Sequence, residues 1–271
     1  MFKLLLLFVL NAVNPSEMVC VGSVQDAMLP LNVYVAAVEM EGIAAFAAQG
    51  QILQLNGPGV SGLKPGTIQR VVRPEGRVKD PLSGDKLGFY YKDIGTIRIE
   101  RVDGDKAMAS VQVSCRDMLK GDVVLPFTPK PNVEFGGDLS TALTPLPDNG
   151  LVSSILLGKD DARQIATGNF CFLGLGSRDG VKSGDRFTVF RSQPGFNPQD
   201  MDVAGTASDR SYSSIANYSY RFKLNGLLHN RKLVPKILGD IIVVDVGERI
   251  STGKVINSIS EMHVGDFIVK R

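Results

Sequence analysis

The sequence predicts an all-β protein of two tandem, small, six-stranded β-barrel modules of the SH3-like kind, joined by a proline-rich linker. The first observation is an internal repeat: residues 61–67 (SGLKPGT) return 118 residues later as residues 179–185 (DGVKSGD), and residues 95–97 (GTI) return 144 residues later as residues 239–241 (GDI). The second is a series of short apolar segments separated by glycine-rich turns, which is typical of small barrels. A long internal repeat indicates two copies of one structural module, whatever secondary structure is assigned to each segment.

The first module, residues 30–127, contains segments of strand length in which apolar and polar residues alternate. Ile97 and Ile99 alternate with charged residues, which is the period-two pattern of a half-buried strand. The Asp-Gly-Asp sequence at 103–105 predicts a hairpin, because glycine adopts a positive φ without strain. The strands expected in this module are residues 32–38, 51–55, 67–72, 95–102, 107–113 and 122–126.

The second module, residues 148–271, repeats this layout after a linker at 128–147 that proline stiffens. The largest difference between the modules is an insertion at 193–236, where the first module has only residues 74–93. The strands expected in the second module are residues 151–157, 169–173, 186–190, 240–246, 252–256 and 266–269.

Residues 1–23 have the features of a cleaved export signal. Lys3 gives a positive start, an apolar run follows at 4–13, and the small residues Gly22 and Ser23 precede the expected cleavage point. The run is shorter than the roughly 20 apolar residues of a membrane span, so no transmembrane span is expected in the mature chain. An uncleaved anchor and a misassigned start are the alternatives. Cys20 lacks the small residues that precede a lipid-attachment site.

The three cysteines are interpreted through the repeat. Cys20 is expected to leave with the signal. The remaining pair permits a disulfide in an exported protein. However, Cys115 aligns with Ile259 and Cys171 aligns with Leu53, so cysteine replaces aliphatic residues in both places. This favours two buried free thiols over a disulfide or a reactive thiol.

Composition leaves few residues for catalysis or metal binding. The 271-residue chain has a net charge of +2, two histidines and no tryptophan. Such a mild charge does not favour nucleic acid as a partner. His263 aligns with Leu119 and is expected in the core, whereas His229 is expected to be solvated. No cofactor, metal site or catalytic set is predicted.

Two glycine-rich patterns are better explained as turns than as binding sites. Residues 174–180 (GLGSRDG) superficially resemble a dinucleotide loop, but the spacing is one residue too long and a strand is expected to follow instead of a helix. The Gly-Asp pairs at 121–122, 184–185 and 265–266 precede strands. We expect glycine to take a positive φ there while aspartate caps backbone N–H groups.

The insertion is the segment whose composition suits contact with a partner, because aromatic and basic residues interleave in it. It fits contact with a protein, a glycan or an anionic lipid surface; the alternative is a solvated excursion without a partner. The residues proposed for partner contact are Tyr212, Tyr218, Tyr220, Arg221, Phe222, Lys223, Arg231 and Lys232.

The run at 173–187 (LGLGSRDGVKSGDRF), closed by residues 259–266 (ISEMHVGD), resembles the C-terminal domain of flagella assembly protein T. Residues 71–76, 79–84 and 93–95 extend a second similarity, covering most of 30–271, to uncharacterised Acidobacteria-type envelope proteins that are often called LysM-domain proteins. These motifs are turns and strands, so the resemblance implies a fold and an envelope location without a catalytic set. The chain has no LysM motif, so peptidoglycan binding is not carried over.

Together these features predict a non-enzymatic protein exported to the periplasm, the outer membrane or the cell surface. Its expected role is a scaffold or assembly component that contacts envelope proteins or itself through the insertion and exposed strand edges. The alternative is a module that binds peptidoglycan or a surface glycan.

Overall fold

The computed structural model describes residues 11–39, 46–147, 150–194 and 233–271. The chain divides into two compact units, which are described separately below. Unit 1 comprises Met1–Lys79 and Lys86–Gly136, and unit 2 comprises Asp80–Asp85 and Gly137–Arg271. The boundary between the units therefore falls within the stretch expected as a linker. Residues 128–136 belong to unit 1 and residues 137–147 belong to unit 2.

The described residues form strands and short 3-10 helices, with no α-helix among them. The strands of unit 1 are β1 (Asn11–Val13), β2 (Ser23–Gln25), β3 (Tyr34–Glu39), β4 (Phe46–Ala47), β5 (Ile52–Asn56), β6 (Ile68–Lys79), β7 (Lys86–Asp103), β8 (Lys106–Ser114), β9 (Met118–Leu119), β10 (Val123–Pro126) and β11 (Val133–Phe135). Those of unit 2 are β12 (Val152–Gly158), β13 (Gln164–Ile165), β14 (Phe170–Leu173), β15 (Arg186–Pro194), β16 (Leu233–Val246), β17 (Ser251–Ser258), β18 (Met262–His263) and β19 (Phe267–Lys270). The 3-10 helices are η1 (Pro15–Met18), η2 (Val60–Gly62), η3 (Lys159–Asp161) and η4 (Ser177–Asp179).

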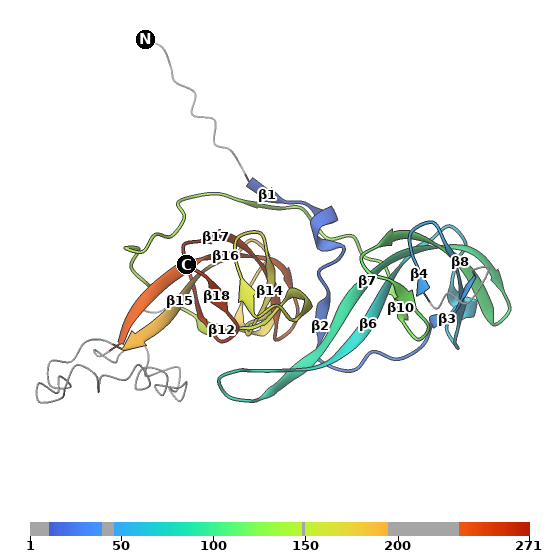
Figure 1. The fold of residues 1–271 in the computed structure, drawn as a ribbon, viewed down its shortest axis with the longest axis horizontal. Coiled ribbons are helices and arrows are strands. Elements are labelled where there is room, and N and C mark those ends of the chain that lie inside the picture. The colour runs from blue at the N-terminus through green and yellow to red at the C-terminus, as the bar shows by residue number, and fades with distance from the viewer. Residues whose placement is uncertain (1–10, 40–45, 148–149, 195–232) are drawn as a thin grey trace, which may run out of the picture. The chain divides into compact units, whose positions relative to one another are not determined.

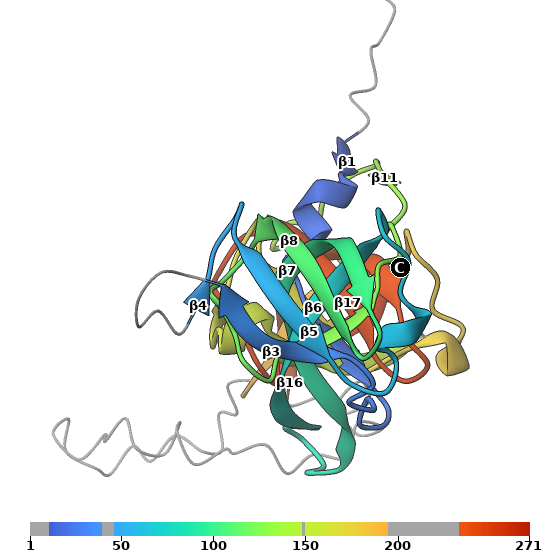
Figure 2. The same cartoon turned by 90° about the vertical axis from the view of Figure 1, so that its right-hand side faces the viewer.

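Six strands of unit 1 close into an antiparallel barrel in the order β3-β5-β8-β7-β6-β10, and β10 pairs back onto β3. Figure 2 shows β3, β5, β8 and β7 of this barrel. The strand β2 adds to the outer edge of β7, at residues 89–91. Outside the barrel, β4 pairs with β9 and β1 pairs with β11.

Unit 2 contains a closed barrel with the same strand order, β12-β14-β17-β16-β15-β19 (Figure 1). Its small accessory pair, β13 with β18, corresponds to β4 with β9 of the first barrel. The prediction of two six-stranded barrels is confirmed. All twelve expected barrel strands are present within about two residues, except that β6, β7, β15 and β16 extend further into hairpin arms.

Each barrel has an interior core because its strands alternate inward apolar residues with outward polar ones. Leu53, Ile97 and Ile99 are fully buried in unit 1, as are Phe187 and Ile241 in unit 2. The sequence at 174–180 connects β14 to β15 through η4, so it is a turn between strands, as predicted.

One glycine in each barrel permits a close approach between strands. Gly95 in β7 and Gly239 in β16 have φ of +155° and +148°. A β-carbon at either position would lie 2.0 Å from a backbone oxygen of the neighbouring strand, that of Val113 or Asn257. Both glycines stand beside a β-bulge, which explains why these glycine positions recur in the repeat.

The Gly-Asp turns have the predicted construction. Gly121, Gly184 and Gly265 have φ of +92°, +90° and +93°. The side chain of Asp122 accepts the N–H of Leu119 at 2.8 Å, and that of Asp266 accepts the N–H of His263 at 2.7 Å. These aspartates are turn caps, as expected.

The same aspartates also bind an arginine from a neighbouring strand. Arg73 donates to Asp122 at 2.8 and 2.9 Å, and Arg191 donates to Asp266 at 2.6 and 2.7 Å. The side-chain hydrogen bond to Asp122 raises the pKa of the Arg73 guanidinium. Because Arg191 lies 118 residues after Arg73 and Asp266 lies 144 after Asp122, this bidentate pair belongs to the duplicated unit.

Candidate functional site

The segment that precedes barrel 1 lies across the outside of β7, and we call residues 20–29 strap 1. Its strand β2 pairs with β7, and the N–H of Leu29 donates to the hydroxyl of Tyr91 at 2.9 Å. Leu29 packs with Val72, Tyr91 and Val123 in a small apolar cluster separate from the barrel interior. Strap 1 therefore covers an outer core that the barrel alone would expose.

A partly buried ion pair fastens strap 1 to the barrel. The guanidinium of Arg70 pairs with Asp93, whose side chain is 3% exposed. Asp93 also accepts the N–H of Gly22 at 2.7 Å, and Arg70 donates to the hydroxyl of Ser23 at 3.2 Å. Burying the carboxylate costs desolvation free energy. The guanidinium of Arg70 and the backbone N–H of Gly22 offset this cost because both donate hydrogen bonds to Asp93.

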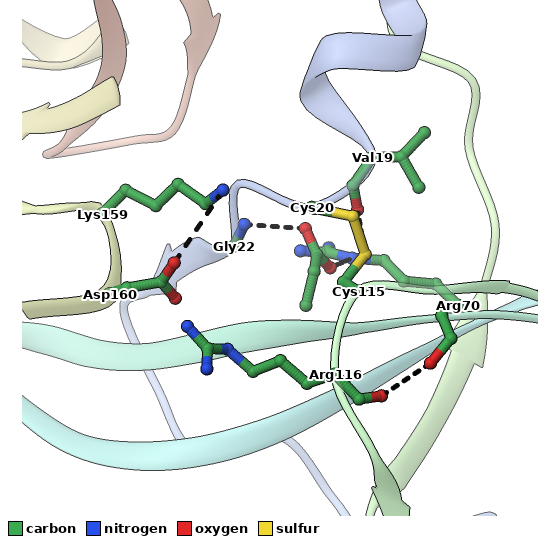
Figure 3. Close-up of a disulfide and its surroundings, with 10 residues drawn as sticks. Val19, Cys20, Gly22, Arg70, Cys115, Arg116, Lys159 and Asp160 are labelled. Carbon is green, nitrogen blue, oxygen red and sulfur yellow. Dashed lines mark hydrogen bonds and ion pairs between the residues drawn. A yellow bond between two sulfur atoms is a disulfide. The ribbon is translucent and has the colours of Figure 1, made fainter. Parts of the chain in front are cut away.

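A disulfide between Cys20 and Cys115 joins the start of strap 1 to the turn after β8 (Figure 3). The interpretation of Cys115 as a buried free thiol is therefore wrong. Its aligned residue Ile259 is 44% exposed, so an aliphatic residue at this position does not indicate a core site. The interpretation of Cys171 as a buried free thiol is confirmed. Its counterpart Leu53 is also fully buried.

In unit 2 a buried serine fastens the segment before the barrel, residues 138–147, which we call strap 2. Ser140 is 3% exposed and donates to Asp240 at 2.6 Å from both its N–H and its hydroxyl. Thr188 donates to the same carboxylate at 3.1 Å, and the amide of Asn257 donates to the Ser140 carbonyl at 2.8 Å. Asp240 is fully buried, and these donors give each of its carboxyl oxygens a hydrogen-bond partner.

Strap 2 also covers an outer apolar cluster. Leu146 packs against Phe190, Ile237, Phe267 and Val269 on the outside of barrel 2. Phe190 and Phe267 are the repeat counterparts of Val72 and Val123 beneath strap 1. The duplicated unit is therefore a barrel with the strap that precedes it.

A cavity of about 250 Å³ opens beside strap 1 in unit 1. Its walls include Met18, Val19 and Phe127, and its polar groups include Gly22 and the Arg70–Asp93 pair. This volume is smaller than the roughly 300–1,000 Å³ of pockets for drug-sized ligands. It suits one small group, such as a single side chain or sugar ring.

All eight insertion residues proposed for partner contact lie within 195–232, outside the described residues, as does His229. His263 is described, and its expected place in the core is wrong. Its side chain is 39% exposed, and its Nδ1 lies 2.7 Å from the guanidinium of Arg191. Its counterpart Leu119 is itself 37% exposed, so the alignment does not identify a buried position.

No protein-family model matches the chain, and no curated protein matches it. Within the described residues, no helix is long and apolar enough to cross a membrane. Histidine, cysteine and acidic side chains in the same part of the chain form no cluster suited to a metal ion.

The thiols provide a direct test of these assignments. Burial raises the pKa of Cys171 to about 12, so its thiolate is not available near neutral pH. At pH 8 we expect iodoacetamide to modify no thiol of the folded, unreduced protein. It should modify one after unfolding and three after unfolding with reductant. Two or more modified thiols in the unfolded, unreduced protein, measured by intact mass, would contradict the disulfide.

Replacing Asp240 by alanine should destabilise unit 2 by roughly 2–3 kcal/mol, because the amide of Ser140 and two hydroxyls lose a buried acceptor. The measurement is urea unfolding followed by a probe in unit 2. Asp240→Asn is the matched control, since it keeps one acceptor oxygen, and it should cost less. Equal stability of Asp240→Ala and the natural protein would show that strap 2 is not held by this carboxylate.

Proposed function

We propose that this chain is an exported, non-enzymatic scaffold or assembly protein of the cell envelope, acting through contacts with envelope proteins or with a second copy of itself. The observation that supports the proposal is that the two units share one strapped barrel but differ in one large insertion. Both units use the same strapped barrel, and their polar networks fasten straps to barrels. The large difference between them is the sequence that joins the hairpin arm β15–β16.

The hairpin arm of unit 2, formed by β15 and β16, favours contact through side chains over addition of a strand. In unit 2, Pro235 lies near the start of β16 and provides no N–H, and its neighbour Lys236 is exposed. Proline and lysine at an edge disfavour pairing with another strand. The aromatic and basic residues between β15 and β16 are therefore the proposed contact element, with Tyr218 and Arg221 near the middle of the insertion.

The proposed location is supported by the sequence of residues 1–23 and by the disulfide. A bond between Cys20 and Cys115 is expected to persist in an oxidising compartment and to be reduced in a bacterial cytosol. Export to the periplasm or to the cell surface would provide that condition.

A site-specific cross-linker tests the contact element. With a photoreactive residue in place of Tyr218, we expect a discrete cross-linked product in intact envelopes. Arg77, exposed on the corresponding arm of unit 1, is the matched control position and should give none. Arg221→Glu combined with Lys223→Glu should remove the product, while deletion of residues 200–232 should leave both barrels folded. A product that survives the charge reversal, or that also forms at Arg77, would contradict this contact element.

The second candidate function is binding of a glycan, and the cavity beside strap 1 favours it. Phe127 contributes an aromatic side chain to the wall, and the Arg70–Asp93 pair contributes polar groups, in a space that fits one sugar ring. Sedimentation of the purified protein with peptidoglycan or envelope polysaccharide separates the two proposals. Binding that persists without other proteins and is lost in Phe127→Ala would favour the glycan.

A further inference from the structure

We infer that the mature protein retains Cys20, so that leader cleavage takes place N-terminal to it, upstream of the point that the sequence at 21–23 indicates. This inference rests on the proposed export. It assigns a processing region, residues 11–19, and makes the Cys20–Cys115 disulfide a feature of the mature chain.

The first argument is that residues 18–25 are part of the fold of unit 1. Met18 and Val21 are 5% and 3% exposed. Gly22 donates its N–H to the buried carboxylate of Asp93, and Ser23 pairs with Tyr91 as the first residue of β2. Cleavage after Ser23 would remove Val21 and Gly22 and would leave Asp93 with one donor fewer.

The second argument comes from the repeat. Gly22 and Ser140 are 118 residues apart, which is the offset that relates the first halves of the two barrels. Both donate their backbone N–H to a buried aspartate of the barrel, at 2.7 and 2.6 Å. Strap 2 lies far inside the chain, where no leader peptidase would remove it. The duplicated unit therefore begins before Gly22, and a leader that ended at Ser23 would cut into it.

The third argument is the disulfide itself. Oxidation of the two thiols forms one S–S bond and releases two protons and two electrons, which a disulfide-donating oxidoreductase of the oxidising compartment accepts. The bond requires Cys20 to reach that compartment as part of the protein. Attachment of a lipid to the Cys20 sulfur would exclude the bond, because the same atom would be consumed.

The sequence supplies a suitable bond upstream. Asn11 interrupts the apolar run at 4–13, and Ala12 follows it. Ala12 provides the small residue that leader peptidases prefer directly before the cleaved bond, while Leu10 stands where their A-x-A-like site has a second small residue. Hydrolysis there consumes one water, leaves a carboxylate on Ala12 and frees the amine of Val13. The mature chain would keep η1, strap 1 and the disulfide, and it would lose Asn11 and Ala12, the first two residues of β1.

The test is intact mass and N-terminal sequence of the full-length protein recovered from the periplasm and from the cytosol of an expressing bacterium. We expect an exported chain that begins at Val13, or elsewhere before Cys20, and is two hydrogen atoms lighter than its reduced form. Ala12→Leu should block processing, whereas Ser23→Leu, the matched control at the later point, should not.

An exported chain that begins after Cys20, that retains Met1 or that carries a lipid on Cys20 would overturn the inference while leaving export intact. A protein found only in the cytosol would instead contradict the proposed function, and the inference with it.

Discussion

Replacement of Gly239 by alanine should destabilise unit 2 by roughly 3–5 kcal/mol, the sum of backbone strain at positive φ and a steric clash. The new β-carbon would lie 2.0 Å from the carbonyl oxygen of Asn257 and 2.7 Å from the terminal carbon of Met262. The carbonyl belongs to the paired strand β17, so relief requires that the ladder between β16 and β17 opens. Urea unfolding with a probe in unit 2 measures the loss.

Gly184→Ala is the control, because Gly184 has φ of +90° and no atom within 4 Å of the added carbon. It should cost only roughly 1–2 kcal/mol, the strain without the clash. Gly95→Ala should produce the large loss in unit 1 and leave the transition of unit 2 unchanged. Equal losses for Gly239→Ala and Gly184→Ala would show that the close approach of β16 and β17 does not constrain the fold.

The barrels could be predicted from sequence because their signals are local and duplicated. Alternation of apolar residues, glycine turns and the repeat spacing are all set by the geometry of a paired strand, and this chain contains each twice. The hairpin arms were missed because residues 73–79 and 86–94 alternate weakly, with charged residues and Gly76 interrupting the pattern. Their pairing depends on the strand opposite, which a single segment does not reveal.

The straps could not be predicted, because they contain little regular structure and their fastening groups come from distant residues. Gly22 and Ser140 occupy equivalent places, yet one is bound by Asp93 and the other by Asp240, which are not equivalent in the repeat. The sequence similarity between the two straps is slight. At the 118-residue offset, Ser23 aligns with Thr141 and Met28 aligns with Leu146. Contacts of this kind are defined by tertiary structure.

Comparison of aligned residues succeeded only where the aligned residue was itself buried. Leu53 is fully buried, and Cys171 behaves as predicted. Leu119 and Ile259 are 37% and 44% exposed, so they gave misleading predictions for His263 and Cys115. Hydrophobic residues are common at protein surfaces, and an aliphatic counterpart alone does not establish a core position.

Removal of the disulfide should have an effect as large as that of the glycine substitution. Cys20 and Cys115 are 95 residues apart in sequence, and closing a loop of that length lowers the entropy of the unfolded chain by the equivalent of roughly 4–5 kcal/mol at 25 °C. Measured losses for native disulfides span roughly 2–5 kcal/mol. We expect the double variant Cys20→Ala, Cys115→Ala to lose stability in this range, because strap 1 would then be held only by non-covalent contacts, such as those of Asp93 and β2.

The effect should be confined to unit 1 and should be reproduced by reductant. Cys171→Ala is the matched control: it removes a buried thiol of unit 2 and should leave the unit 1 transition unchanged. Natural protein and double variant should unfold at the same urea concentration once dithiothreitol is present, since both then lack the bond. A difference between them that persists under reduction would assign the loss to packing of the two side chains, and identical stability without reductant would show that strap 1 is held without the bond.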